Sequence, residues 1–166
     1  MLRAFYPNEL AASVYEIDFN SWYKRAYRGI IFDIDNTLVP HGAPADERII
    51  RFFQQLHNQG FRTILISNNK EPRVKPFAVA VDSDYIHMAK KPSPSAYLEA
   101  MEKIGTNPRT TLFVGDQLFT DVYGAKRVGI YTIRVNPIHP KEEIQIVLKR
   151  QLERIVLFFY RKERRK

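Results

Sequence analysis

The sequence predicts an α/β fold, a three-layer α/β/α arrangement around a mostly parallel, five-stranded sheet. Short segments rich in β-branched and aromatic residues alternate with stretches long enough to be helices, which is the order typical of βαβ units. Several of these segments are apolar at successive positions, as strands buried on both faces are. The chain of 166 residues has the length of one core, so we expect residues 1–166 to form a single domain.

The expected strands are five short segments separated by helical stretches. They cover residues 29–35, 62–68, 85–89, 110–116 and 130–135. Helical patterns cover residues 46–58, 95–104, 120–128 and about 141–160. The first helix has four apolar residues at helical spacing: Ile49, Phe52, Phe53 and Leu56. Gly60 follows it as a C-terminal signal, and residues 1–28 precede the first strand as an extension.

The last expected helix is amphipathic. Its apolar stripe consists of Ile144, Leu148, Leu152, Ile155 and Phe159. Charged residues lie off that stripe: Lys149, Arg150, Glu153 and Arg154. We expect the stripe to pack on the core, with membrane contact as the alternative. A basic tail ends the chain: Arg161, Lys162, Arg164, Arg165 and Lys166.

The composition is that of a soluble globular protein, with 45% hydrophobic and 27% charged residues. Cysteine is absent, which excludes disulfides, thiolate catalysis and cysteine-ligated zinc. The sequence shows neither a secretory signal nor a membrane span, and the absence of cysteine fits a reducing compartment. We therefore expect a cytoplasmic protein, with peripheral placement at the inner face of the membrane as an option. The net charge of +8 favours a polyanionic partner, such as nucleic acid, an anionic bilayer or a phosphorylated substrate. A tail that is simply solvated explains the charge equally well.

Polar residues follow the expected strands, at the edge where open parallel sheets bind ligands. Asp33 and Asp35 end the first segment, and residues two apart in a strand project to the same side. Two such carboxylates suit a hard cation together with a nucleophile and a proton carrier. A calcium loop of the EF-hand type is excluded, because Leu38 stands where glycine is needed and Pro44 where glutamate is needed.

The other strand ends add groups that suit a phosphate. Ser67, Asn68 and Asn69 end the second segment and are short hydrogen-bond donors. Lysine follows the third segment as Lys90 and Lys91, and the fourth ends in Asp116 with Asp121 close behind. Together these residues predict a pocket for Mg²⁺ and a phosphoryl group.

Four segments, in chain order, resemble the four motifs of the HAD superfamily. They are Asp33-Ile-Asp35-Asn36-Thr37, Ser67-Asn68-Asn69, Lys91-Pro92 and Gly115-Asp116-Gln117-Leu118-Phe119-Thr120-Asp121. One such motif alone is weak evidence, but four at successive strand ends are hard to obtain by chance. The resemblance implies a HAD-like Rossmannoid fold and a phosphatase that forms an aspartyl-phosphate.

The resemblance also implies a role for each matching residue. Asp33 would attack phosphorus, and Asp35 would protonate the leaving group and then activate water. The implied Mg²⁺ ligands are the carboxylates of Asp33 and Asp116 and the backbone carbonyl of Asp35. Phosphate binding would come from Ser67, Asn68 and Lys91. Thr37 and Asp121 would support the site, Asp121 directly at the metal or through water.

Plainer explanations exist for some of these residues. Ser67 also fits a helix N-cap, and Lys90 competes with Lys91 for the cationic role. Asp82 and Asp84 are expected to be turn acids. The four histidines lack metal-ligand spacing and are expected at the surface or in packing: His41, His57, His87 and His139.

Neither segment where HAD enzymes insert a cap domain has room for one, so we expect a capless enzyme that accepts a large or surface-bound substrate. The wording of the motifs resembles YqeG-like subfamily IIIA phosphatases, which are similar to phosphatidylglycerophosphate phosphatases. This resemblance implies a phosphorylated lipid substrate. An open site and the basic tail also fit peripheral contact with an anionic membrane. Aromatic and basic residues of the N-terminal segment fit that contact, although packing on the protein itself is favoured: Trp22, Tyr23, Lys24, Arg25, Tyr27 and Arg28.

Two rival functions remain open from the sequence. One is a phosphatase of a soluble phosphometabolite or of a phosphoprotein. The other is a basic accessory protein that binds nucleic acid, which only the charge supports, since no RNA-binding motif is recognisable. The oligomeric state does not follow from the sequence.

Overall fold

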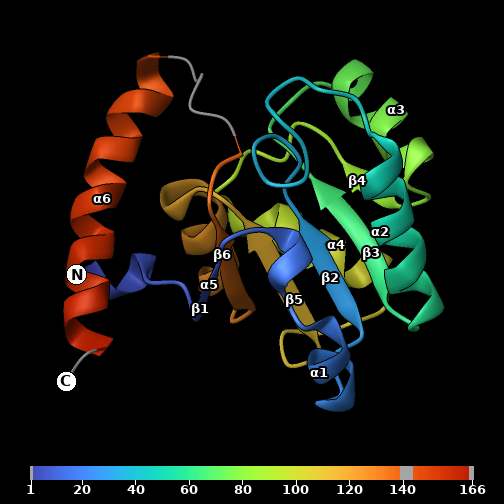
Figure 1. The fold of residues 1–166 in the computed structure, drawn as a ribbon, viewed down its shortest axis with the longest axis horizontal. Coiled ribbons are helices and arrows are strands. Elements are labelled where there is room, and N and C mark those ends of the chain that lie inside the picture. The colour runs from blue at the N-terminus through green and yellow to red at the C-terminus, as the bar shows by residue number, and fades with distance from the viewer. Residues whose placement is uncertain (1, 139–143, 165–166) are drawn as a thin grey trace.

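A fully parallel sheet of six strands runs through the molecule in the order β1-β6-β5-β2-β3-β4 (Figure 1). The computed structural model describes residues 2–138 and 144–164. The strands are β1 (Glu9–Ala11), β2 (Gly29–Phe32), β3 (Arg62–Ile66), β4 (Asp84–Ile86), β5 (Thr111–Gly115) and β6 (Tyr131–Val135). The predicted α/β class with a parallel sheet is confirmed.

The predicted number of five strands is wrong, because β1 adds a sixth strand at the edge next to β6. This strand pairs Leu10 with Arg134 in parallel register and contains only three residues. Three half-buried residues that include Glu9 carry no recognisable strand pattern, so the pairing depends on the neighbouring strand. The N-terminal extension is therefore part of the sheet.

Helices cover both faces of the sheet. Helices α1 (Phe19–Lys24), α2 (Glu47–Asn58) and α3 (Glu71–Ala80) pack on one face, and α4 (Pro94–Lys103) and α5 (Tyr123–Arg127) pack on the other. In Figure 1, α1 and α2 lie in front of the sheet and α4 lies behind it. The expected helix 120–128 is divided into a π-helical turn, η3 (Leu118–Val122), and α5. Two 3₁₀ turns, η1 (Leu2–Phe5) and η2 (Val14–Glu16), complete the N-terminal segment.

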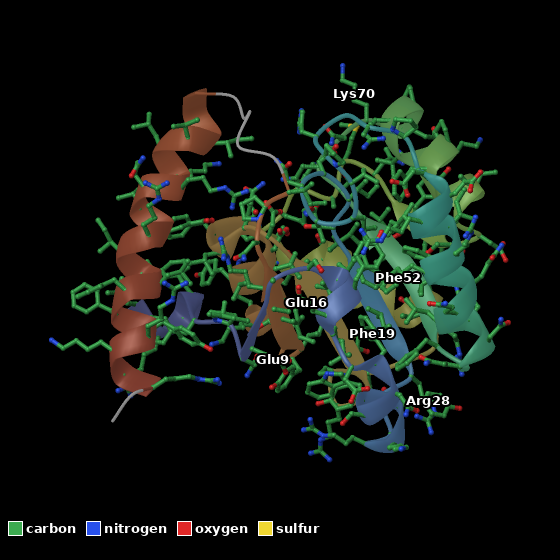
Figure 2. The ribbon with its side chains drawn as sticks, in the orientation of Figure 1. Glu9, Glu16, Phe19, Arg28, Phe52 and Lys70 are labelled. Carbon is green, nitrogen blue, oxygen red and sulfur yellow. The ribbon has the colours of Figure 1, made fainter. Side chains whose placement is uncertain are left out.

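Helix α2 follows the sequence pattern closely. Asp46 caps it by accepting a hydrogen bond from the backbone nitrogen of Ile49 at 2.8 Å, and the four apolar residues at helical spacing are buried. Phe52 packs against Phe19 with ring centroids 5.8 Å apart, and Figure 2 labels both. This aromatic contact joins α1 to α2 above the sheet.

The aromatic and basic residues of the N-terminal segment pack on the protein itself. Trp22 is buried, and its ring centroid lies 4.8 Å from that of Tyr27. Arg25 stacks over Trp22 at 4.0 Å, and Arg28 stacks over Tyr23 at 3.8 Å. These contacts favour packing over the membrane contact that the sequence left open for this segment.

Helix α6 (Ile144–Arg164) lies beside the edge of the sheet and packs on η1 and η3. Its buried apolar residues are Val156, Leu157 and Tyr160. The prediction that the apolar stripe packs on the core is wrong, since Leu148, Leu152, Ile155 and Phe159 are exposed. The expected helix start at Lys141 and the last two residues of the basic tail, Arg165 and Lys166, lie outside the described residues. Neither α6 nor another helix within residues 2–138 and 144–164 is long and apolar enough to cross a bilayer.

The two connections in which the resemblance to HAD enzymes would place a cap are short. Residues 33–46 join β2 to α2 as a loop, and residues 67–70 join β3 to α3. Neither connection carries an inserted domain, so the capless architecture is observed. The carboxyl ends of β2, β3 and β5 are therefore not covered by a separate cap.

Candidate active site

The carboxyl ends of three neighbouring strands bring the predicted residues together. Asp33 follows β2, Ser67 follows β3 and Asp116 follows β5. Because β2 lies between β3 and β5 in the sheet, these three positions share one edge. The loop after β4 adds Lys91, and η3 adds Asp121.

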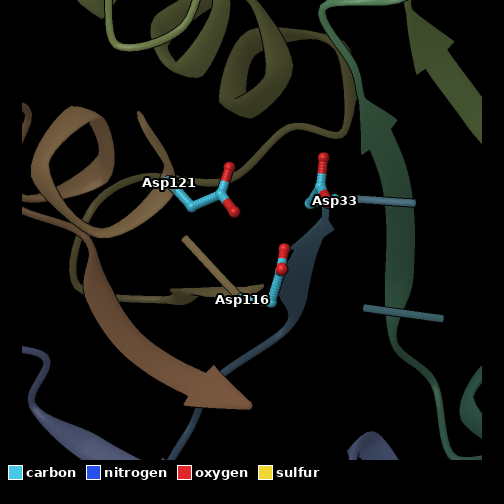
Figure 3. Close-up of side chains that lie close together, drawn as sticks. All are labelled: Asp33, Asp116 and Asp121. Carbon is cyan, nitrogen blue, oxygen red and sulfur yellow. The ribbon is translucent and has the colours of Figure 1, made fainter. Parts of the chain in front are cut away.

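Three buried carboxylates form the centre of the site (Figure 3). Asp33, Asp116 and Asp121 each offer an oxygen, and these three atoms lie within 4.8 Å of one another. Gly115 makes this approach possible, because a Cβ there would lie 2.6 Å from a carboxylate oxygen of Asp121. The backbone nitrogen of Gln117 donates to the same side chain at 3.0 Å and fixes its orientation. Oxygen ligands grouped in this way suit a hard divalent cation.

A buried lysine links two of the carboxylates. The ammonium of Lys91 donates to Asp33 at 2.6 Å and to Asp121 at 2.7 Å. The hydroxyl of Thr37 lies 3.2 Å from Asp33 and 3.1 Å from Asp116, so it can donate to either. Lys90, the competing lysine, is exposed and does not reach this cluster.

The carboxylates are difficult to ionise together. Burial raises the pKa of Asp33 to about 8, since the neighbouring carboxylates of Asp121 and Asp116 add to it and Lys91 offsets only part. Burial and Asp121 also raise the pKa of Asp116 to about 6 against the opposing effect of Arg150. Burial would lower the pKa of Lys91, but the two carboxylates that it contacts outweigh burial and raise it. A positive charge next to these carboxylates therefore stabilises their ionised form.

Asp35 occupies a different part of the site from Asp33. Its carboxylate accepts hydrogen bonds from Asn69 at 2.6 Å, from Arg73 at 2.9 Å and from the backbone nitrogen of Gly42 at 2.7 Å. It is not one of the three clustered carboxylates, and Asp121 takes the third position. The two side chains therefore do not meet at one point, because Asn69, Arg73 and the Gly42 nitrogen hold the Asp35 carboxylate away from the cluster, although both acids line the same cavity.

The residues after β3 brace the loop that carries Lys91. The backbone nitrogen of Lys91 donates to Asn68 at 2.7 Å, and the Asn68 side chain donates to the carbonyl of Lys91 at 3.3 Å. The Ser67 hydroxyl accepts from the backbone nitrogen of Asn69 at 3.1 Å. Ser67 is not a helix N-cap, because Lys70 holds that position at α3.

A cavity of about 400 Å³ opens above these residues. It is lined by Asp33, Asp35, Asn36, His41, Ser67, Asn68, Asn69, Lys91, Gln117, Thr120, Ile146 and Lys149. Acidic, amide, hydroxyl and cationic groups therefore face one space. The sequence predicts His41 only at the surface or in packing, yet it lines this cavity with its ring nitrogen 4.0 Å from the Asp35 carboxylate.

Helix α6 reaches the site, which the sequence patterns did not indicate. Arg150 forms an ion pair with the carboxylate of Asp116 and donates to the carbonyl of that residue at 3.1 Å. Glu153, which is buried, pairs with the half-buried Arg150 at 2.9 Å and accepts from the backbone nitrogen of Leu118 at 2.7 Å. Two opposite charges three residues apart, on the face opposite the apolar stripe, were the available signal.

Other polar residues lie away from the site. Asp82 has a positive φ of 52° in the turn after α3, and Asp84 begins β4. His57 hydrogen-bonds the Thr63 hydroxyl at 2.8 Å, as expected for a packing residue. His139 lies outside the described residues.

The fold resembles solved structures. The cobalt-bound deoxy-D-mannose-octulosonate 8-phosphate phosphatase of Haemophilus influenzae superposes with a TM-score of 0.53 and 13% identity. That match covers 66% of this chain and 68% of the other, and at this identity it shows the fold alone.

Sequence relatives are more informative. The probable phosphatase YqeG of Bacillus subtilis is 35% identical over 95% of this chain and 92% of its own length. The chloroplastic and mitochondrial phosphatidylglycerophosphate phosphatase 1 of Arabidopsis thaliana is 28% identical over 90% of this chain, which spans 45% of that protein. The family model of haloacid dehalogenase-like hydrolases matches residues 42–129. Together with the parallel sheet, these matches show that the chain belongs to the haloacid dehalogenase-like hydrolases and is a phosphoric monoester hydrolase.

Proposed function

We propose that this phosphatase uses Mg²⁺ and an aspartyl-phosphate on Asp33, and that its substrate is phosphatidylglycerophosphate, which it converts to phosphatidylglycerol. The observation that carries the chemical part is the cluster of three buried carboxylates with Lys91 bonded to two of them. A buried acid next to a fixed cation and an open cavity suits a nucleophile that is used and regenerated.

The donor set fits a divalent cation of the Mg²⁺ type. Asp33 and Asp116 would hold it by their carboxylates and Asp35 by its backbone carbonyl, with Asp121 as a further carboxylate of the cluster. When bound, the ion would offset negative charge on the carboxylates and on the phosphoryl oxygens. All the side-chain donors are oxygens, as Mg²⁺ prefers.

The proposed reaction divides between two acids. A carboxylate oxygen of Asp33 attacks phosphorus, and the bond from phosphorus to the leaving oxygen breaks as Asp35 gives that oxygen a proton. Asp35 then takes a proton from water, whose oxygen attacks the phosphoryl group and releases inorganic phosphate and free Asp33. Ser67, Asn68 and Lys91 would bind the phosphoryl oxygens during both steps. The position of both acids on one cavity supports this division.

The lipid substrate rests on the open site and on similarity. Neither of the connections 33–46 and 67–70 carries an inserted domain that would cover the cavity. A large headgroup attached to a bilayer can therefore reach it. Two relatives named as phosphatidylglycerophosphate phosphatase 1, from Arabidopsis thaliana and Chlamydomonas reinhardtii, match 90% and 89% of this chain. We also propose that residues 1–166 act as one phosphatase domain, since the N-terminal segment supplies β1 to the catalytic sheet.

Phosphate release from a panel of substrates tests this function. The panel compares phosphatidylglycerophosphate in detergent micelles with soluble phosphate esters and a phosphopeptide, each with Mg²⁺ and with a chelator. We expect the lipid to give the highest kcat/KM and the chelator to abolish turnover. If a soluble ester or the phosphopeptide is hydrolysed as well as the lipid, the substrate proposal fails, whereas the phosphatase chemistry stands.

A further inference from the structure

We propose that the outer face of α6 docks on an anionic membrane surface and holds the mouth of the active site at the lipid headgroups. The docking goes beyond the chemistry proposed above, and only its link to a lipid substrate rests on that function. The occupant we assign is a bilayer that contains acidic phospholipids.

The first observation is a concentrated apolar face. Six of the eleven large apolar side chains that are exposed in the described part of the chain belong to this one helix: Val147, Leu148, Leu152, Ile155, Phe158 and Phe159. Ile155 is 54% exposed and Phe158 is 63% exposed. A helix turns 100° per residue, so these positions share one side of it, opposite Leu157 and Tyr160, which are buried. Figure 1 shows α6 along one side of the molecule, and the exposure of these six side chains places their face on its outer side.

The second observation is the charge around that face. Of the exposed basic residues of α6, Arg154, Arg161 and Lys162 lie in or beside the apolar face, whereas Lys149 lines the cavity and Arg164 donates to the carbonyl of Asn8. The only acids of α6 within residues 144–164 are Glu153, which is buried, and Glu163, which pairs with Arg3 at 3.0 Å. An apolar face with leucine and phenylalanine beside exposed lysine and arginine is the pattern of a helix that lies in an anionic interface.

The same charges argue against a second copy of the chain. Packing two α6 faces around a two-fold axis would bring two sets of basic residues together with no unpaired exposed acid on the described part of the helix to offset them. An anionic bilayer supplies the missing negative charge. Charge complementarity thus selects the membrane over self-association.

The third observation is the position of this helix at the active site. Ile146 and Lys149 of α6 line the same cavity as Asp33 and Asp35. The helix that would rest on the bilayer is therefore also a wall of the catalytic cavity. Lys149 would add a positive charge to that wall, which attracts a headgroup phosphate toward the cavity.

Vesicle flotation of the 166-residue protein tests the docking. We expect the protein to float with vesicles of phosphatidylcholine and phosphatidylglycerol and to stay behind with pure phosphatidylcholine. The double variant Ile155→Gln with Phe158→Gln should lose at least about tenfold in partitioning, because two apolar side chains no longer enter the interface. The matched double variant Val79→Gln with Leu98→Gln changes two exposed apolar residues on α3 and α4, and it should bind like the wild type.

The folded state of both variants is checked by their thermal unfolding curves, which should overlay that of the wild type. Equal binding by the two double variants would overturn the proposal, as would a wild-type protein that ignores acidic vesicles. A dimer in sedimentation that the α6 variant alone dissociates would assign the face to a second copy instead.

The two proposals fail in different ways. If the protein binds acidic vesicles through α6 but does not hydrolyse phosphatidylglycerophosphate, the docking stands and the substrate is another molecule. If the lipid is hydrolysed in micelles, but vesicle binding is absent or insensitive to the α6 variant, the substrate stands and the docking is wrong.

Discussion

At the scale of single residues, the burial of Asp33 decides how the site behaves. Its carboxylate lies among two other carboxylates and one ammonium, largely out of contact with bulk water. Replacing Asp33 by asparagine keeps the shape and removes the proposed nucleophile. We expect Asp33→Asn to lower kcat by at least about 10³-fold in a phosphate-release assay.

Asp82→Asn is the matched control for that variant, because Asp82 lies in a turn away from the cavity. It should keep wild-type turnover. Substantial turnover by Asp33→Asn, with the control equally active, would assign the nucleophile to another residue.

The raised pKa values of Asp33 and Asp116 predict that Mg²⁺ affinity depends on pH. Protons held by these groups must leave before the cation binds, so affinity should rise with pH between about 6 and about 8. Isothermal titration calorimetry in two buffers of different ionisation enthalpy measures the affinity and the protons released. Affinity that stays flat over this range would show that the carboxylates are already ionised.

The raised pKa of Asp33 also makes the stability of the metal-free protein depend on pH. Asp33 binds its proton more tightly in the folded chain than in the unfolded chain. Its contribution to the free energy of unfolding is therefore fully present below about pH 4 and is lost as the pH rises through about 8.

Arg150 places a guanidinium beside Asp116, where a bound cation would also be attracted. Removing this charge should leave the carboxylates more available to a metal. We expect Arg150→Met to bind Mg²⁺ roughly fivefold or more tightly in calorimetry. Arg154→Met is the control, since Arg154 is exposed on the same helix and should leave the affinity unchanged. Weaker binding by Arg150→Met would mean that Arg150 supports the metal-loaded site.

At the scale of elements, a buried acid attaches α6 to the start of η3, next to the ion pair of Arg150 with Asp116. Glu153 joins Arg150 to the backbone of Leu118, at the start of η3. The apolar contacts of Val156 and Leu157 with Leu118 and Val122 strengthen the same attachment. Helix α6 and the π-helical turn therefore position Asp116 and Asp121 together.

Replacing this acid should weaken the attachment strongly. We expect Glu153→Leu to lower the free energy of unfolding by about 3 kcal/mol, because it leaves Arg150 and the Leu118 nitrogen without this partner. Urea denaturation measures the change. Gln151→Leu is the control on an exposed position of α6, and it should stay within about 0.5 kcal/mol of the wild type. Equal stability of the two variants would show that the Glu153 contacts do not hold the helix.

At the scale of the whole molecule, the fold concentrates negative charge in a protein whose net charge is +8. The exposed surface and the site therefore attract ions of opposite sign: the surface attracts anions, and the site attracts a cation. A ligand that binds only the folded state stabilises it, so Mg²⁺ should protect the protein against heat. The site thus couples metal binding to global stability.

We expect a saturating Mg²⁺ concentration, about 100 times its Kd, to add about 2.7 kcal/mol and to raise Tm by roughly 5–10 °C. Differential scanning calorimetry with and without the ion measures this shift. Asp116→Asn should show little or none of it. An equal rise in both proteins would point to Mg²⁺ binding elsewhere.

Local sequence patterns account for the α/β class, for five of the strands and for the residues that end them. Buried parallel strands are short apolar segments, and this pattern is local in the sequence. Strands such as those in residues 29–35 and 110–116 can therefore be recognised from the sequence alone. The shared strand edge then follows from parallel topology, so the order of the segments along the chain already groups Asp33, Ser67 and Asp116. Strand-end positions also indicated Lys91 and Asp121, and the resemblance of the motifs favoured Lys91 over Lys90 and implied a supporting role for Asp121.

Long-range contacts were needed to establish the pairing of β1, the separation of Asp35 from the carboxylate cluster and the orientation of α6. A three-residue edge strand depends on its neighbour, and a loop direction depends on contacts such as those from Asn69 and Arg73. An amphipathic pattern shows that a helix has two faces but not which face turns inward. Here Arg150 pairs with Asp116 and Glu153 binds the backbone nitrogen of Leu118, so the charged face of α6 turns toward the protein. The apolar stripe is therefore exposed to solvent.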